Sequence, residues 1–149
     1  MLNKNFADML TAFNEAGVEY LVVGAYAMAA HGCPRATGDI DFWVRASEAN
    51  AKRVWAALEK FGAPLSKVSV SDFFTADIVY QMGVPPQRID ILTSISGVDF
   101  AEAWPERLVV QVGDLTVSVI GIHQLYANKL ASGRAKDQLD AEILAERLG

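Results

Sequence analysis

Acidic and apolar side chains alternate from Asp39 to Val44, where the sequence reads DIDFWV. Residues two apart in a β-strand project from the same face, so Asp39 and Asp41 share one face and the apolar side chains take the other. Two like charges side by side are unfavourable unless a positive charge offsets them. The pattern therefore predicts either a strand end that exposes both acids to water or a divalent cation held by both, and carboxylate oxygens suit Mg²⁺ or Mn²⁺.

A further acid, Asp90, lies within the apolar run RIDILT from Arg88 to Thr93. A carboxylate inside a core strand is costly unless it is paired or bound to a metal. Arg88 is the alternative partner, although we expect it to point to the opposite face of the strand. The position of Asp90 therefore favours a shared site with Asp39 and Asp41 over a pair of solvent-exposed acids.

The residues before Asp39 predict a phosphate-binding turn. An apolar strand over residues 19–23 ends at Gly24, and Ala25 opens a run of helix-forming residues. A helix N-terminus offers free backbone N–H groups and the positive end of the helix dipole, both of which favour phosphate. The strand, the small-residue turn, the helix and the three acids together predict a site for a metal-bound nucleoside triphosphate.

Helices and strands follow one another along the chain in an order typical of an α+β domain. Apolar periodicity and capping residues predict helices that end at Gly17 and Gly62, a short helix near 99–105, and C-terminal helices over 122–131 and 135–148. Apolar runs predict strands over 39–44, 78–82, 88–93, 108–112 and 115–120, the last two joined by a Gly113-Asp114 hairpin turn. This order favours a mixed sheet over a doubly wound parallel sheet.

The length and composition are those of a globular domain. The 149 residues predict one domain over 1–149, with a helical C-terminal part at about 121–149. Hydrophobic residues make up 52% and charged residues 21%, which excludes a disordered chain. The 18 acidic and 13 basic side chains give a formal charge of −5, which argues against an extended nucleic-acid docking surface. A nucleotide or an RNA end held at one local site remains compatible with this charge.

A single cysteine, Cys33, predicts a reducing compartment, because one cysteine forms no internal disulfide. The longest uncharged stretches, 20–34 and 115–128, are shorter than the roughly 18 residues of a membrane span, and no apolar export signal follows Lys4. We therefore expect a soluble, cytoplasmic protein without a membrane partner.

Three blocks of sequence resemble the DNA-polymerase-β-type nucleotidyltransferase superfamily, and within it the small bacterial and archaeal proteins related to the AbiEii toxin family. They read LVVGAYAMAAHGCPRATGDID over 21–41, GVPPQRIDILT over 83–93 and NKLASGRAKD over 128–137. The resemblance extends over most of the chain. It implies the nucleotidyltransferase fold, in which a mixed β-sheet is flanked by helices and ends in a short C-terminal helical pair.

The resemblance also assigns roles to the acids and to the turn before them. It implies that Asp39, Asp41 and Asp90 converge on one or two Mg²⁺ ions, with Mn²⁺ as the alternative. It implies that Gly24 and the backbone amide of Ala25 bind the nucleotide phosphates. The family usually has glycine or serine where this chain has Ala25, which supplies no hydroxyl and resists the positive φ that glycine tolerates.

The C-terminal helices carry the remaining candidates. By resemblance, four residues contact or approach the triphosphate: Lys129 and Asp137, and as weaker candidates Arg35 and Arg134. The alternative for these helices is a solvated charged face. For Lys136 and Asp140 we prefer that alternative, because their i, i+4 spacing is that of an ordinary surface pair.

These features predict a metal-dependent nucleotidyltransferase that moves a nucleoside monophosphate from a nucleoside triphosphate to an acceptor and releases pyrophosphate. One metal would bridge the triphosphate and a second would acidify the attacking hydroxyl, with Asp90 as proton acceptor or as a ligand of the second metal. The acceptor could be an RNA end, a protein hydroxyl or a small molecule. A toxin role, with an antitoxin as partner, follows from the resemblance alone. The alternative is a nucleotide-binding protein that keeps the fold and has lost turnover.

Overall fold

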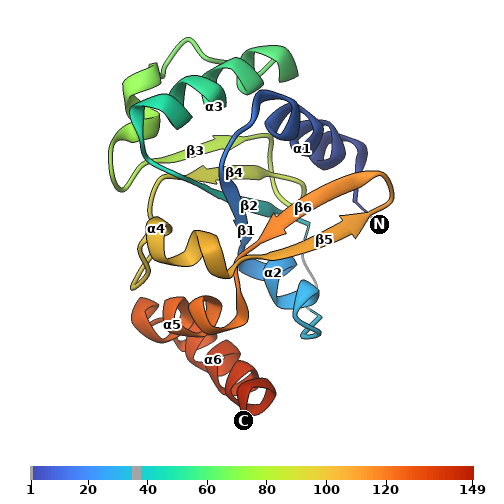
Figure 1. The fold of residues 1–149 in the computed structure, drawn as a ribbon, viewed down its shortest axis with the longest axis vertical. Helices are drawn as coiled ribbons and strands as arrows, with labels where there is room; N and C mark the ends of the chain where they lie inside the picture. Colours follow the sequence, from blue (N-terminus) through green and yellow to red (C-terminus); the bar gives the residue numbers. More distant parts are fainter. Residues whose placement is uncertain (1, 35–37) are drawn as a thin grey trace.

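The computed structural model describes residues 2–34 and 38–149, and within them a six-stranded mixed sheet with helices packed around it (Figure 1). The strands are β1 (Tyr20–Val23), β2 (Ile40–Val44), β3 (Val79–Met82), β4 (Ile89–Leu92), β5 (Leu108–Val112) and β6 (Leu115–Val119). Their order across the sheet is β3-β4-β2-β1-β6-β5. β2 pairs in parallel with β4, and β1 with β6, whereas the other neighbours are antiparallel. The structure confirms the predicted mixed sheet flanked by helices.

The helices fall into groups at opposite ends of the molecule. They are α1 (Lys4–Ala16), α2 (Gly24–Ala30), α3 (Glu48–Phe61), α4 (Phe100–Ala103), α5 (Ile122–Ser132) and α6 (Ala135–Leu148), with 3₁₀ turns η1 (Val70–Phe74) and η2 (Trp104–Glu106). Figure 1 shows α1 beside α3 at one end and α5 beside α6 at the other. None of the described helices is both long and apolar enough to cross a bilayer.

Local capping signals place the ends of α1 and α3 where the sequence predicts them. Asn3 accepts a hydrogen bond from a backbone N–H of the first turn of α1 at 2.9 Å, and Ser47 does the same for α3 at 3.1 Å. Each contact satisfies an N–H group that the helix itself leaves unpaired. Gly17 and Gly62 follow the last residues of the two helices.

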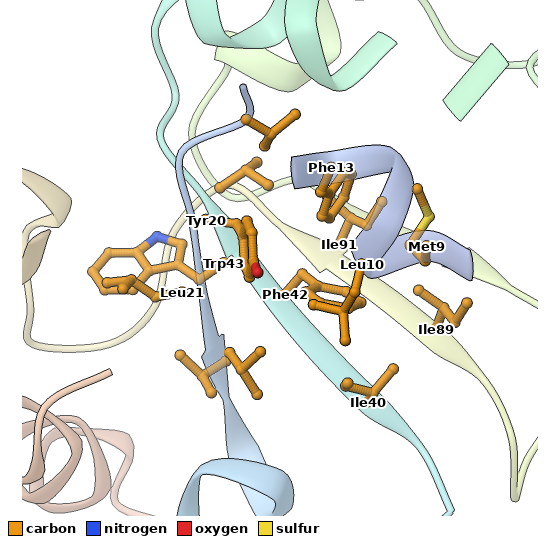
Figure 2. Packing of buried hydrophobic residues seen from close by; sticks show 14 of the residues in the cluster. Met9, Leu10, Phe13, Tyr20, Leu21, Ile40, Phe42, Trp43, Ile89 and Ile91 are labelled. Atoms are coloured by element: carbon orange, nitrogen blue, oxygen red, sulfur yellow. The ribbon is translucent and has the colours of Figure 1, made fainter. Parts of the chain in front are cut away.

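The two faces of β2 pack against different helices. On one face Phe42 contacts Phe13 of α1, with ring centroids 5.1 Å apart, and Figure 2 shows α1 lying over this layer. On the other face Trp43 contacts Phe100 of α4 at 5.0 Å. Alternation along the strand puts Asp41 on the same face as Trp43, where it lines a cavity.

The register of the sheet brings the acidic positions together at one end. Asp41 and Asp90 are Cα partners in the parallel pair β2–β4, and the partner of Asp41 on its other side is Val23. Val23 is the last residue of β1, so Gly24, the first residue of α2, lies beside the acids. Asp39 immediately precedes β2. The β1–α2 turn and all three acids therefore lie at the same end of the sheet.

Candidate active site

Asp39, Asp41 and Asp90 line one cavity of about 530 Å³ at the end of the sheet where β1, β2 and β4 meet. We call these three residues the acidic group. Asp90 is buried, with 7% of its surface exposed, whereas the side chain of Asp39 is 27% exposed. The acidic group therefore runs from the interior of the sheet to its solvent-exposed rim.

Arg88 is a cation that contacts Asp39 and Asp90 of the acidic group. Its Nε and Nη2 atoms donate to the two carboxylate oxygens of Asp90 at 2.7 and 3.1 Å, and its backbone N–H donates to Asp39 Oδ1 at 2.8 Å. The guanidinium also lies 3.8 Å from Asp39 Oδ2. The expectation that Arg88 and Asp90 point to opposite faces is therefore wrong, because residues two apart along a strand share a face.

The surroundings of Asp41 favour the protonated form of its carboxyl group. Burial raises the pKa of Asp41 to about 7, together with the negative charge of Asp90, a hydrogen bond with the Asp90 carboxyl group and the charge of Asp39, while Arg88 acts in the opposite direction. Like charges that share a site favour the protonated form of one of them. Within the described part of the chain, the charge of Arg88 therefore does not cancel the effect of the neighbouring acids on Asp41, and a divalent cation would lower their repulsion.

The donor chemistry of the acidic group fits Mg²⁺ or Mn²⁺, because both ions prefer carboxylate oxygens. Within residues 2–34 and 38–149 as they are arranged here, no three His, Cys, Asp or Glu side chains are placed to hold a metal ion together. In this arrangement the guanidinium of Arg88 bonds both oxygens of Asp90. A metal ion bound by Asp90 would have to replace at least one of these two hydrogen bonds.

Gly24 is adapted to its place beside the acidic group. Its φ is 72°, and a Cβ atom added to it would overlap Asp41 Oδ2, so both the backbone and the neighbouring carboxylate require glycine. Ala25 avoids the expected backbone penalty, because Asp77 is the one non-glycine residue with a positive φ in the described part of the chain. Ala25 therefore adopts its backbone conformation without strain, and compared with serine it lacks only the side-chain hydroxyl.

A second set of charges links α5 to α6, and we call Lys129, Arg134, Asp137 and Asp140 the hairpin group. Lys129 Nζ lies 3.1 Å from Asp137 Oδ1 and 3.1 Å from Asp140 Oδ2, and Arg134 Nε lies 3.0 Å from Asp137 Oδ2. Ser132 Oγ donates to the same Asp137 oxygen at 2.6 Å. Two acids and two bases therefore balance each other within direct contact.

Asp137 stays ionised in this environment. Burial by itself raises the pKa of its carboxyl group, but the hydrogen bonds from Ser132 and Lys129 and the charges of Lys129 and Arg134 outweigh burial, so the pKa lies below its usual value. The carboxylate is thus held by partners within the hairpin group and needs no further cation.

Asp140 corrects the expectation of a solvated charged face. Only 1% of its surface is exposed, and it pairs with Lys129 instead of Lys136. A sequence signal for this burial does exist, since Asp137, Asp140 and Leu144 recur at helical spacing on the buried side of α6. Lys136 is exposed as expected, but it also lines the cavity.

The cavity brings together every predicted site residue that the structure describes. These residues are Gly24, Ala25, Asp39, Asp41, Asp90, Lys129, Arg134 and Asp137. Arg35, a weaker candidate for a phosphate contact, lies outside the described residues.

Besides Ser132, the last residue of α5, three polar residues of the cavity wall were not singled out from the sequence: Ser94, Ser96 and Asn128. Asn128 Nδ2 donates to the backbone oxygen of Ser96 at 3.0 Å, which ties α5 to the segment after β4. Asn128 lies in one of the three blocks of the resemblance, directly before Lys129, and its position there is the signal that could have found it. The two serines follow β4 without a motif.

No family model and no curated protein sequence matches the chain. Among solved structures, it is similar to that of a presumed nucleotidyltransferase from Thermotoga maritima, with a TM-score of 0.61, 18% sequence identity, and 99% of this chain and 95% of that chain covered. At this identity the similarity shows a shared fold. The chain therefore has the nucleotidyltransferase fold that its sequence predicts, whereas the relation to AbiEii-type proteins stays a prediction.

Proposed function

We propose that the protein is a metal-dependent nucleotidyltransferase, which moves a nucleoside monophosphate from a nucleoside triphosphate to an acceptor hydroxyl. The observation that carries this proposal is that Asp39, Asp41 and Asp90 line one cavity, where Asp41 and Asp90 lie side by side on neighbouring strands. Carboxylates at this density favour a divalent cation. The fold shared with a presumed nucleotidyltransferase supports the same function.

The cavity offers separate walls for the metal and for the phosphates. Asp39 and Asp41 hold Mg²⁺ or Mn²⁺ in this proposal, and Gly24 and Ala25 contribute backbone groups toward the phosphates. Arg134 has a side chain that is 79% exposed and still lines the cavity, so it can contact phosphate from the solvent side. A guanidinium suits this role because its planar donors match phosphate oxygens.

The reaction is a substitution at the α-phosphorus of the nucleotide. The acceptor oxygen forms a bond to this phosphorus, the bond to the oxygen that bridges to the β-phosphate breaks, and pyrophosphate leaves. Asp90 takes the proton of the acceptor hydroxyl or joins the metal ligands. The metal, when bound, supplies positive charge that stabilises the leaving pyrophosphate and acidifies the acceptor hydroxyl.

The acceptor is an RNA end, a protein hydroxyl or a small molecule. The chain has 18 acidic and 13 basic side chains, which disfavours a long basic docking surface. An RNA acceptor would therefore be held at its end. The toxin role, the antitoxin partner and the relation to AbiEii-type proteins rest on the sequence resemblance. A cytoplasmic location rests on Cys33, the single cysteine, which is free and buried.

A second candidate function is nucleotide binding without turnover. The observation that favours it is the bidentate contact between Arg88 and Asp90, which occupies the acid proposed as proton acceptor. The two candidates differ in one measurable property, because both bind nucleotide with metal and only the first transfers it.

Transfer of label from each α-labelled nucleoside triphosphate, with Mg²⁺ or Mn²⁺ and a mixed RNA and protein extract, tests the proposal. We expect label in a macromolecule, and we expect Asp39→Asn and Asp41→Asn to lower the rate by a factor on the order of 100 or more, since metal catalysis contributes several kcal/mol. Asp114→Asn is the matched control, because Asp114 is exposed in the β5–β6 turn and does not line the cavity.

Two other results separate the candidates. Metal-dependent binding of nucleotide in a thermal-shift assay, without transfer to any acceptor in the extract or to added small molecules, favours the binding protein. The absence of any metal-dependent thermal shift with all four nucleotides contradicts both functions.

A further inference from the structure

The guanidinium of Arg88 lies near two acids of the cavity and hydrogen-bonds Asp90, the acid proposed as proton acceptor. Both oxygens of Asp90 accept from the guanidinium, at 2.7 and 3.1 Å, while Asp39 Oδ2 lies 3.8 Å away. Charge-assisted, bidentate contacts of this kind are among the stronger hydrogen bonds in proteins. Arg88 is therefore a bound cation within the acidic group, supplied by the chain itself.

The contact is exposed enough to be exchanged. The side chain of Arg88 is 28% exposed and lines the same cavity as the acids, whereas the side chain of Asp90 is 10% exposed. The backbone N–H of Arg88 bonds Asp39 separately, at 2.8 Å, and does not depend on where the guanidinium points. The guanidinium can thus leave Asp90 without disturbing the main chain of β4.

We propose that Arg88 is a built-in counter-ion that competes with a divalent metal for Asp90 and Asp39, so that the metal binds tightly only when a nucleotide is present. This inference rests on the proposed function and names a positioning residue for it. Without nucleotide, the guanidinium neutralises part of the acidic group and occupies oxygens that a metal needs.

A nucleoside triphosphate relieves this competition. Its phosphate oxygens bring negative charge into the cavity, and two of them can accept a bidentate pair of hydrogen bonds from the planar guanidinium, as a carboxylate does. Arg88 then turns from Asp90 to a phosphate, and the carboxylate becomes a ligand. Binding of metal and nucleotide is therefore cooperative, and thermodynamic linkage requires the effect to be reciprocal.

Titration of each purified variant with Mn²⁺ alone, followed by the signal of free Mn²⁺ in electron paramagnetic resonance, tests the inference without turnover. Arg88→Met removes the guanidinium and keeps a side chain of comparable length. We expect it to bind Mn²⁺ about tenfold more tightly than the wild type, because a competing charge a few ångströms away is lost. Working at about pH 8 keeps carboxyl groups with raised pKa values ionised.

Arg45→Met is the matched control. Arg45 has the same side-chain exposure as Arg88, 28%, and also pairs with one acid at 2.8 Å, but its partner is Glu19 and neither residue lines the cavity. We expect its Mn²⁺ affinity to equal that of the wild type. Arg88→Lys serves as a second variant if Arg88→Met does not fold, and we expect a smaller gain, because lysine keeps the charge and loses the planar pair of donors.

The outcomes separate failure of this inference from failure of the proposed function. If Arg88 variants bind Mn²⁺ no more tightly than the wild type, while the wild type gives a metal-dependent thermal shift with a non-hydrolysable nucleotide, the inference is wrong and the proposed function stands. If no variant binds Mn²⁺ with or without nucleotide, both are wrong. A gain in Arg88→Met that exceeds the change in Arg45→Met supports the inference.

Discussion

Residues of the acidic group and of the hairpin group line the same cavity, but the two groups differ in how their buried carboxylates are neutralised. In the acidic group three carboxylates meet the guanidinium of Arg88, and the pKa of Asp41 rises to about 7, chiefly through burial and the neighbouring acids. In the hairpin group two carboxylates meet two bases, and the pKa of Asp137 falls because hydrogen bonds and positive charges outweigh its burial.

This difference distinguishes a binding site from a structural one. Buried charges that are paired within the protein stabilise a specific arrangement and leave little to offer a ligand. An excess of like charge makes the free protein less stable, and a cation that binds there stabilises it. The four predictions below test this contrast, from the largest expected change in stability to the smallest.

Lys129→Met should destabilise the protein most. The substitution leaves Asp137 and Asp140, both buried, without the ammonium that pairs with each of them at 3.1 Å. We expect the free energy of unfolding in urea to fall by about 3 to 5 kcal/mol, as for other buried ion pairs that lose one partner. Lys136→Met is the control, since Lys136 is exposed on α6, the helix that carries Asp137 and Asp140, and should change stability by about 0.5 kcal/mol or less. Equal losses in the two variants would contradict a structural role for the hairpin group.

The same change of Asp to Asn should have opposite signs in the two groups. Asp137→Asn weakens charge-assisted hydrogen bonds and should lower the free energy of unfolding by about 2 kcal/mol. Asp41→Asn removes a like charge beside Asp90 and should raise it by about 1 kcal/mol in EDTA at about pH 8. Urea denaturation of the two variants beside the wild type measures both effects. A destabilised Asp41→Asn protein would show that the acidic group is not in excess of negative charge.

Substituting alanine for two glycines with nearly the same φ angle distinguishes the cost of backbone strain from the cost of a steric clash between the new Cβ atom and a neighbour. Gly24 and Gly133 have φ values of 72° and 73°, and only at Gly24 would an added Cβ meet an atom, Asp41 Oδ2. We expect Gly133→Ala to cost about 1 kcal/mol from strain and Gly24→Ala about 2 kcal/mol. Thermal or urea unfolding measures the cost, and Mn²⁺ titration should show weaker binding in Gly24→Ala alone. Similar behaviour of the two variants would argue that Asp41 is not held against the turn.

The two groups should also lose stability at opposite ends of the pH range. Because the folded-state pKa of Asp41 is raised to about 7, the folded protein binds more protons than the unfolded chain at mildly acidic pH. Stability of the metal-free protein should therefore fall by about 1 kcal/mol as the pH rises from about 5 to about 7, and Asp41→Asn should remove this slope. Asp137, with a lowered pKa, contributes stability that is lost only as the pH falls below about 4. Urea unfolding in EDTA across this pH range checks both, and a wild-type slope that persists in Asp41→Asn would assign the effect to other groups.

Much of the local structure follows from short-range signals in the sequence. Gly17 and Gly62 follow the last residues of α1 and α3 as predicted, and Gly113 lies in the turn between β5 and β6. The alternation from Asp39 to Val44 correctly places both acids on one face of β2, because the two-residue period is a property of the strand itself. The blocks of the resemblance also contain all three residues of the acidic group, Asp39, Asp41 and Asp90.

The partners of individual charges were harder to predict. Arg88 and Asp90 share a face by the same two-residue period, whereas the position of Asp39 and Asp41 beside this pair depends on the parallel pairing of β2 with β4. Asp140 looked like a surface residue because its spacing from Lys136 fits an exposed pair. Its burial follows from the way α6 packs against α5, where Lys129 lies on the facing side.

The sequence by itself therefore determined the helices, the strands, the chemical types of the site residues and the class of fold. Those properties depend on interactions among residues a few positions apart, which a window of sequence contains. The tertiary structure alone decided that Asp41 lies opposite Asp90, that Arg88 lies near Asp39 as well as Asp90, and that Lys129 is shared by two buried carboxylates. The physical reason is that strands and helices distant in the chain pair so as to bury their apolar faces, and the charges they carry then meet at spacings that no local pattern records.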